Sequence, residues 1–158
     1  MGMYKPKYFK LEEFIPEIVH LRRGELAWEL LDPKMVQTWD ELREMRGHPI
    51  SLNTWCYGGS KQNQCLRTCT YYNGQNSYSQ HPLGKAGDGL EKSYDSIKEQ
   101  VEFIRTVKAL GALKHLTGIE VGEEWLHLDT RVTDRCNDEG LFFFTKEGII
   151  NIEEYVWP

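Results

Sequence analysis

Two short segments of the chain each combine an imidazole with a carboxylate, and together they restrict the fold more than any other feature of the sequence. The first segment, residues 79–88, places His81 seven positions before Asp88 in a stretch interrupted by glycines. The second segment, residues 124–129, places His127 on a short run in which polar and apolar side chains alternate. If the two segments form one site, the fold must bring distant parts of the chain together. The sequence therefore predicts a site shared between them.

His81, Asp88 and His127 form a set that suits a catalytic zinc ion. Two neutral imidazoles and one carboxylate fill three tetrahedral positions of zinc and leave the fourth for water. Their combined charge of minus one leaves the metal positive, which lowers the pKa of bound water toward about 7 and polarises a carbonyl group. The sequence thus predicts one zinc ion per chain. The alternative for each residue taken singly is an ordinary polar histidine or a turn aspartate.

A zinc hydrolase also needs a base beside the attacking water, and the residues before His127 offer two. Glu124 is the candidate and Glu123 is its competitor. A regular strand from Trp125 to Asp129 would point Glu124 to the face opposite His127, so the assignment requires a bulge or turn before Trp125. Asp129 shares the face of His127 and is expected to orient an imidazole by a hydrogen bond.

The composition predicts one soluble, monomeric domain. The 158 residues can bury a single core and leave no room for a second, so residues 1–158 are treated as one domain. The net charge of -5 argues against nucleic acid or an anionic membrane as partner. No apolar run approaches the roughly 20 residues of a spanning helix, and the first residues lack the apolar core of a signal peptide. We therefore expect a product made in the cytoplasm that does not insert into membranes.

The cysteines do not change this interpretation. Four cysteines at uneven spacing are too few for a disulfide framework in a cytoplasmic chain. Cys65 and Cys69 could offer zinc thiolates, but no CxxC pair accompanies them, and a buried apolar role is the stronger alternative.

The apolar patterns predict an α+β fold in which a small antiparallel sheet carries His127 and Asp88 and the helices pack on one of its faces. Pro16 divides residues 8–23 into two short helical pieces. Asp32 and Pro33 begin a helix that Gly47 ends. Further elements are a helix over residues 93–110 and strands over residues 49–53, 125–129, 141–145 and 149–155, the last two forming a hairpin.

Residues 58–80 are polar and show no hydrophobic period, which predicts a long loop just before His81. Loops of this length in a small domain are commonly functional or mobile. The alternative is a disordered insertion.

The paired motifs resemble a known family of zinc peptidases. The residues that carry the resemblance are Ser79, His81, Gly84, Ala86 and Asp88, followed by Glu124, His127 and Asp129. In this spacing they look like the zinc D-Ala-D-Ala carboxypeptidase and L-alanyl-D-glutamate endopeptidase family, which shares its fold with the hedgehog signalling domain. The resemblance covers roughly residues 9–131.

The resemblance implies that His81, Asp88 and His127 bind zinc, that Glu124 is the base, and that Ser79 lies near the substrate. It further implies cleavage of peptidoglycan stem or cross-bridge peptides, by either of the two bond specificities. Short members of this kind are similar to phage endolysins and virion-associated lysins, which act at the cell wall.

One departure from the family pattern concerns an arginine that binds the developing oxyanion. Tyr57 occupies the matching place, in the sequence Thr-Trp-Cys-Tyr of residues 54–57. A phenol brings no charge, and loss of one oxyanion donor typically lowers the rate by about 10²–10³. Arg67, in the polar loop, is the alternative source of this charge. The departure keeps a second function open, that of a zinc-binding virion structural or binding protein with weak or no peptidase activity.

Overall fold

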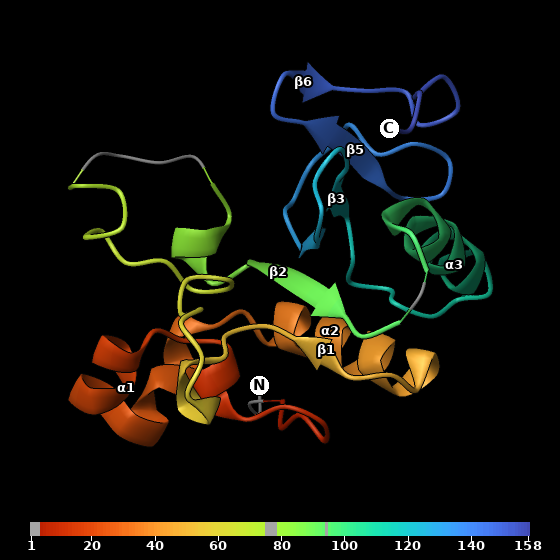
Figure 1. Cartoon of the computed structure of the whole chain (residues 1–158). Helices are drawn as coiled ribbons and strands as arrows, with labels where there is room; N and C mark the ends of the chain where they lie inside the picture. Colours follow the sequence, from red (N-terminus) through yellow and green to blue (C-terminus); the bar gives the residue numbers. More distant parts are fainter. Residues whose placement is uncertain (1–3, 75–78, 94) are drawn as a thin grey trace.

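The computed structural model describes residues 4–74, 79–93 and 95–158 of the chain (Figure 1). It combines helices with one six-stranded sheet, and the predicted α+β class is confirmed. No helix in this part of the chain has the length and apolar character needed to cross a bilayer.

The N-terminal region forms short helices, as Pro16 predicts. The 3-10 helix η1 (Leu11–Glu13) and helix α1 (Glu17–Arg23) lie on either side of this proline, and the 3-10 helix η2 (Gly24–Leu30) follows. Helix α2 (Pro33–Arg46) begins where the Asp32 side chain accepts a hydrogen bond from the backbone N–H of Lys34, at 2.9 Å. It ends at Gly47, whose φ of 68° is one that glycine adopts without strain.

The sheet has the strand order β1-β2-β4-β3-β5-β6. The strands are β1 (Ile50–Ser51), β2 (Ala86–Glu91), β3 (Gly118–Glu120), β4 (Leu126–Asp129), β5 (Phe142–Thr145) and β6 (Gly148–Ile149). All neighbours are antiparallel except β3 and β5, which are parallel. The sheet is thus antiparallel, as predicted, except at this pair, which is parallel because the chain crosses β3 between β4 and β5.

The two faces of the sheet differ in what they contact. A Cβ atom on Gly87 would lie 2.4 Å from Nε1 of Trp39, and one on Gly89 would lie 2.6 Å from the ring of the same residue. Strand β2 therefore rests directly on helix α2, which lies below β2 in Figure 1. Since side chains alternate along a strand, Asp88 and its cross-strand partner His127 point to the opposite face.

The face of the sheet that contacts the helices borders the hydrophobic core. The second long helix, α3 (Ile97–Ala109), begins with a capping box in which Ser96 and Glu99 exchange side-chain-to-backbone hydrogen bonds. Its start lies within the predicted range of residues 93–110. The core combines side chains from both long helices and from three strands: Met35, Val36, Trp39, Leu42, Val101, Ile104, Ile119, Leu126, Leu128 and Phe143. Both long helices thus support the sheet from the side away from Asp88 and His127.

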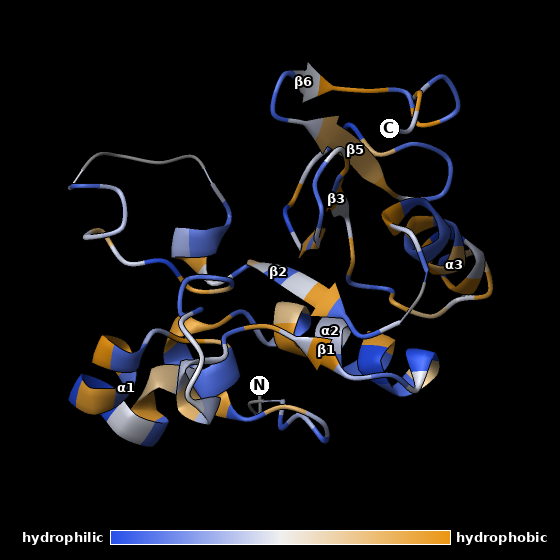
Figure 2. Ribbon diagram, viewed as in Figure 1, coloured by the Kyte–Doolittle hydropathy of each residue, from blue (hydrophilic) through white to orange (hydrophobic). Residues whose placement is uncertain are grey.

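The C-terminal hairpin is confirmed, with a second strand shorter than predicted. Strands β5 and β6 pair around a turn at Lys146 and Glu147, but β6 ends at Ile149 and the chain turns again over residues 152–154. Figure 2 shows β5 as largely hydrophobic and the turn that leads to β6 as hydrophilic.

The predicted loop of residues 58–80 has no helix or strand in its described parts, which are residues 58–74 and 79–80. Residues 75–78 lie outside the described residues. Cys65 and Leu66 are buried in the core, and the backbone N–H of Asp88 donates to the carbonyl of Gln64 at 2.7 Å. This part of the loop is therefore anchored against β2 and is not a disordered insertion.

Candidate metal centre

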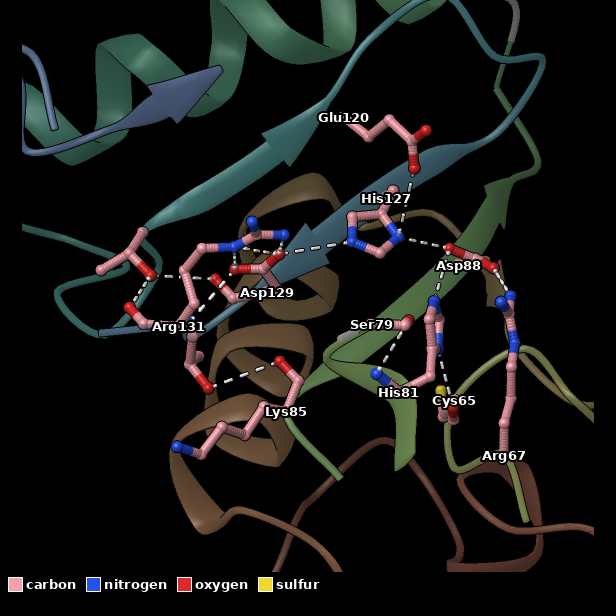
Figure 3. A network of polar contacts seen from close by, with 12 residues as sticks. Cys65, Arg67, Ser79, His81, Lys85, Asp88, Glu120, His127, Asp129 and Arg131 are labelled. Atoms are coloured by element: carbon pink, nitrogen blue, oxygen red, sulfur yellow. Dashed lines mark hydrogen bonds and ion pairs between the residues drawn. The ribbon is translucent and has the colours of Figure 1, made fainter. Parts of the chain in front are cut away.

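His81, Asp88 and His127 meet beside the paired strands β2 and β4, as the sequence predicts. His81 opens the 3-10 helix η4 (His81–Leu83), and Asp88 and His127 are direct partners in the β2–β4 ladder. One nitrogen or oxygen atom from each residue lies within 4.8 Å of the others, and all three side chains are buried. Figure 3 shows the three converging from η4, β2 and β4. They form a group that could hold a metal ion.

Each imidazole presents one nitrogen to Asp88 and has the other nitrogen beside an oxygen acceptor. Nδ1 of His81 lies 2.7 Å from the carbonyl oxygen of Cys65, while its Nε2 lies 3.4 Å from Oδ1 of Asp88. Nδ1 of His127 lies 2.7 Å from the same Oδ1, while its Nε2 lies 3.4 Å from Oδ2 of Asp129. When the outer nitrogens carry the protons, the inner nitrogens offer lone pairs to a cation. Cys65 thus contributes its carbonyl group, not a thiolate.

Asp129 takes the orienting position expected from its shared strand face with His127. Its carboxylate is fully buried and accepts two hydrogen bonds from Nε of Arg131, at 2.9 and 2.8 Å. The β3 residue beside it is Gly118, where an added Cβ would lie 2.2 Å from Oδ1 of Asp129. The absence of a side chain at this position makes room for the carboxylate behind His127.

The charges around the three residues favour a cation. Burial alone would raise the pKa of the Asp88 carboxyl, but hydrogen bonds with His127 and His81 hold this pKa well below its ordinary value. Burial opposes protonation of His127, but Asp129 and Asp88 outweigh it and raise the His127 pKa to about 9. The carboxylates therefore stabilise positive charge at the point where the two rings meet.

A cavity of about 560 Å³ opens beside these side chains. Its wall includes the three candidate ligands together with charged, polar and aromatic groups: Arg67, Tyr71, Ser79, Gln80, Glu120, Trp125, Arg131, Phe144 and Lys146. Arg131 lies over the rings of Phe142 and Phe144, at 5.1 and 4.3 Å from their centres. The cavity thus brings the three candidate ligands together with several hydrogen-bond donors.

Two predicted substrate-binding residues reach the cavity. Ser79 lines it, and its Oγ accepts a hydrogen bond from the backbone N–H of His81 at 3.4 Å. Arg67 lines it as well and donates from its guanidinium to Oδ2 of Asp88. Its Nε also donates to the carbonyl of Asn63 at 2.8 Å, and the guanidinium lies 4.9 Å from the ring centre of Tyr71.

Two other predicted site residues lie elsewhere. Tyr57 is 60% exposed on the 3-10 helix η3 (Trp55–Tyr57), where Lys10 lies over its ring, and it does not line the cavity. Glu124 lines a separate cavity with Ser96 and Trp157. The chain does bend over residues 122–125, as the Glu124 assignment required, but the bend brings Trp125 and not Glu124 to the cavity of the candidate ligands. Neither Tyr57 nor Glu124 therefore lies with His81, Asp88 and His127 in this structure.

Glu120 is the carboxylate that the sequence reasoning missed. It is the β3 partner of His127, and its Oε2 lies 3.9 Å from Nδ1 of that ring. Burial raises the pKa of the Glu120 carboxyl. In the sequence, Ile119 and Val121 on either side of Glu120 show the alternation of a short strand. That alternation was the available signal.

Comparison with protein-family models, with curated proteins and with solved structures gives no match for this chain.

Proposed function

We propose that the protein is a zinc-dependent peptidase that hydrolyses peptide bonds in peptidoglycan stem or cross-bridge peptides, as phage-associated cell-wall lysis requires. The observation that carries the proposal is the convergence of His81, Asp88 and His127 on the wall of one cavity. Two imidazoles and a carboxylate are a common donor set for catalytic zinc and leave one tetrahedral position for water or substrate. The motif spacing, which resembles zinc carboxypeptidases and endopeptidases of the cell wall, supplies the substrate class.

The donor set fits zinc because, in each imidazole, the nitrogen that points away from Asp88 has a hydrogen-bond acceptor beside it. The Cys65 carbonyl and the Asp129 carboxylate each accept from an outer nitrogen of one imidazole, which fixes the rings and leaves the inner nitrogens as ligands. When bound, zinc would supply Lewis acidity that polarises the scissile carbonyl and lowers the pKa of water.

Glu120 is the residue we assign as general base, in place of Glu124. Its carboxylate lies on the same sheet face as His127 and lines the cavity. From there it can accept the proton of the attacking water and return it to the leaving amine.

Arg67 is the residue we assign to the carbonyl oxygen of the substrate. A guanidinium has five N–H donors, and the contacts with Asn63 and Asp88 occupy two of them. The remaining donors can stabilise the negative charge that develops on the carbonyl oxygen. Arg67 would thus take the role of the family arginine, as the alternative to Tyr57 that the sequence offered.

The test is turnover on purified bacterial cell wall, measured as release of new amino groups. We expect release by the zinc-loaded protein, loss of release with a chelator, and recovery when zinc is restored. Release that persists in a His81→Ala variant would contradict a zinc mechanism. Zinc binding without release would favour the second function, a virion structural or binding protein with weak or no peptidase activity.

A further inference from the structure

Three cationic side chains line the candidate cavity, and they differ in how firmly they are held. Arg131 is paired with the fully buried Asp129 through both carboxylate oxygens. Arg67 is held by Asp88 and by the carbonyl of Asn63. Lys146 is the third, and its side chain is 67% exposed.

Lys146 has a single ion-pair partner among the described residues, the carboxylate of Glu123. It lies in the turn between β5 and β6, and its Nζ lies 5.7 Å from the ring centre of Trp125, which also lines the cavity. The ammonium has three N–H donors, and the carboxylate of Glu123, whose side chain is only 10% exposed, accepts from one of them. The exposed side of the ammonium can therefore take a second acceptor without disturbing the candidate metal ligands.

We propose that Lys146 binds a carboxylate of the substrate while it stays paired with Glu123, and that the site is selective for anionic peptides. The inference rests on the proposed function, since it names the substrate class of the same cavity. The new contact adds a second charge-assisted hydrogen bond to the ammonium, and Trp125 keeps its place beside the lysine stem. Lys146 is a specificity residue and takes no part in proton transfer.

A peptide can supply this carboxylate from its C-terminus or from an acidic side chain. Both offer the same group to an ammonium, which is a point charge with three donors and no preference for a planar, bidentate partner. Four synthetic stem peptides separate the two sources. Two have a free C-terminus and two have an amidated C-terminus, and within each pair one peptide contains glutamate and the other contains glutamine.

The experiment measures the affinity of zinc-loaded protein for the four peptides by isothermal titration calorimetry. We expect the parent protein to bind one free-carboxylate form about tenfold more tightly than its amide, the range of one hydrogen bond to a charged group. This ratio should fall to near one in Lys146→Gln. In Glu123→Gln, which removes a negative charge that repels the substrate carboxylate, affinity for the acidic peptide should rise severalfold while affinity for the amide stays unchanged.

Lys98→Gln is the matched control, because Lys98 is exposed and lines a different cavity. A Lys146→Gln variant that keeps the parent's ratio between acid and amide would overturn the inference, and so would failure of every peptide to bind. Hydrolysis of the same peptides is followed in parallel. Zinc-dependent hydrolysis with no preference for the carboxylate-bearing peptide would support the proposed function and contradict the inference about Lys146. Preferential binding of that peptide without hydrolysis would support the inference about Lys146 and contradict the proposed function.

Discussion

Glu120 and Glu124 are both acidic residues close to His127 in sequence, but only Glu120 shares a cavity with it. Glu120 reaches this position through strand pairing, since β3 lies beside β4 and places the two residues opposite each other. Glu124 precedes β4 and faces the start of α3, on the other side of the bend. Proximity along the chain therefore selects a carboxylate that lines a different cavity.

A pair of isosteric variants tests this assignment. We expect Glu120→Gln to lower kcat by about 10²–10⁴ while zinc binding is retained, because the variant loses the proton acceptor but keeps all three ligands. Glu124→Gln is the matched control and should keep the parent rate. Steady-state hydrolysis and metal content of both variants provide the measurement, and a loss of rate confined to Glu124→Gln would restore the sequence-based assignment.

Among the residues of the candidate site, the sequence predicts those that can be recognised by their type and spacing. His81, Asp88 and His127 are found from their chemistry, and Asp129 from the alternation of a strand. Glu120 and the anchoring of Arg67 depend on which strand and which loop segment lie beside the ligands. Those are long-range pairings that no local pattern contains.

Strand β2 carries Asp88 and packs against helix α2 on its other face. Gly87 and Gly89 lie directly on Trp39 of α2, so Asp88 projects from a strand that has no side chains at its two neighbouring positions. This contact brings the backbone of β2 closer to the helix than any larger residue would allow.

Gly87→Ala tests this contact. The added methyl group would meet Nε1 of Trp39 at 2.4 Å, and we expect overpacking to lower the free energy of unfolding by about 1–3 kcal/mol. Urea denaturation measures the change. In a double variant with Trp39→Leu, the two effects should be less than additive, because the smaller side chain removes the clash. Additive effects would mean that the glycine has another role.

The ends of helix α2 can be predicted from the sequence because capping signals are local. The pairing of strand β5 with β3 cannot be predicted in this way. Asp32 with Pro33 and Gly47 mark the ends of α2 by capping chemistry that acts within a few residues. The parallel pairing of β5 with β3 depends on a connection that crosses the sheet. The phenylalanine-rich run of β5 indicates a strand but does not specify its neighbour.

In the whole molecule the candidate metal ligands and the core lie on opposite sides of one sheet. The core takes side chains from the N-terminal helices as well as from the last strands, while the ligands come from residues 81–127. Metal binding therefore joins segments that the core already holds together, and a bound ion should add to stability without being required for folding.

Chelation tests this coupling. An ion that binds only the folded chain stabilises it by about 2.7 kcal/mol at a free concentration 100-fold above its dissociation constant. For a protein of this size each kcal/mol moves Tm by about 2–4 °C, so we expect zinc to raise Tm by about 5–10 °C relative to the chelated protein. Differential scanning calorimetry gives the shift, and His81→Ala should show none. An equal shift in this variant would place the stabilising ion elsewhere.

The facing positions of Asp88 and His127 across β2 and β4 have a consequence for assembly of the sheet. If either strand slid by a single position, one of the two ligands would turn toward Trp39 and the ion would lose a donor. Only chains that have aligned these strands correctly could therefore capture the ion, so capture would discriminate native molecules from misaligned ones.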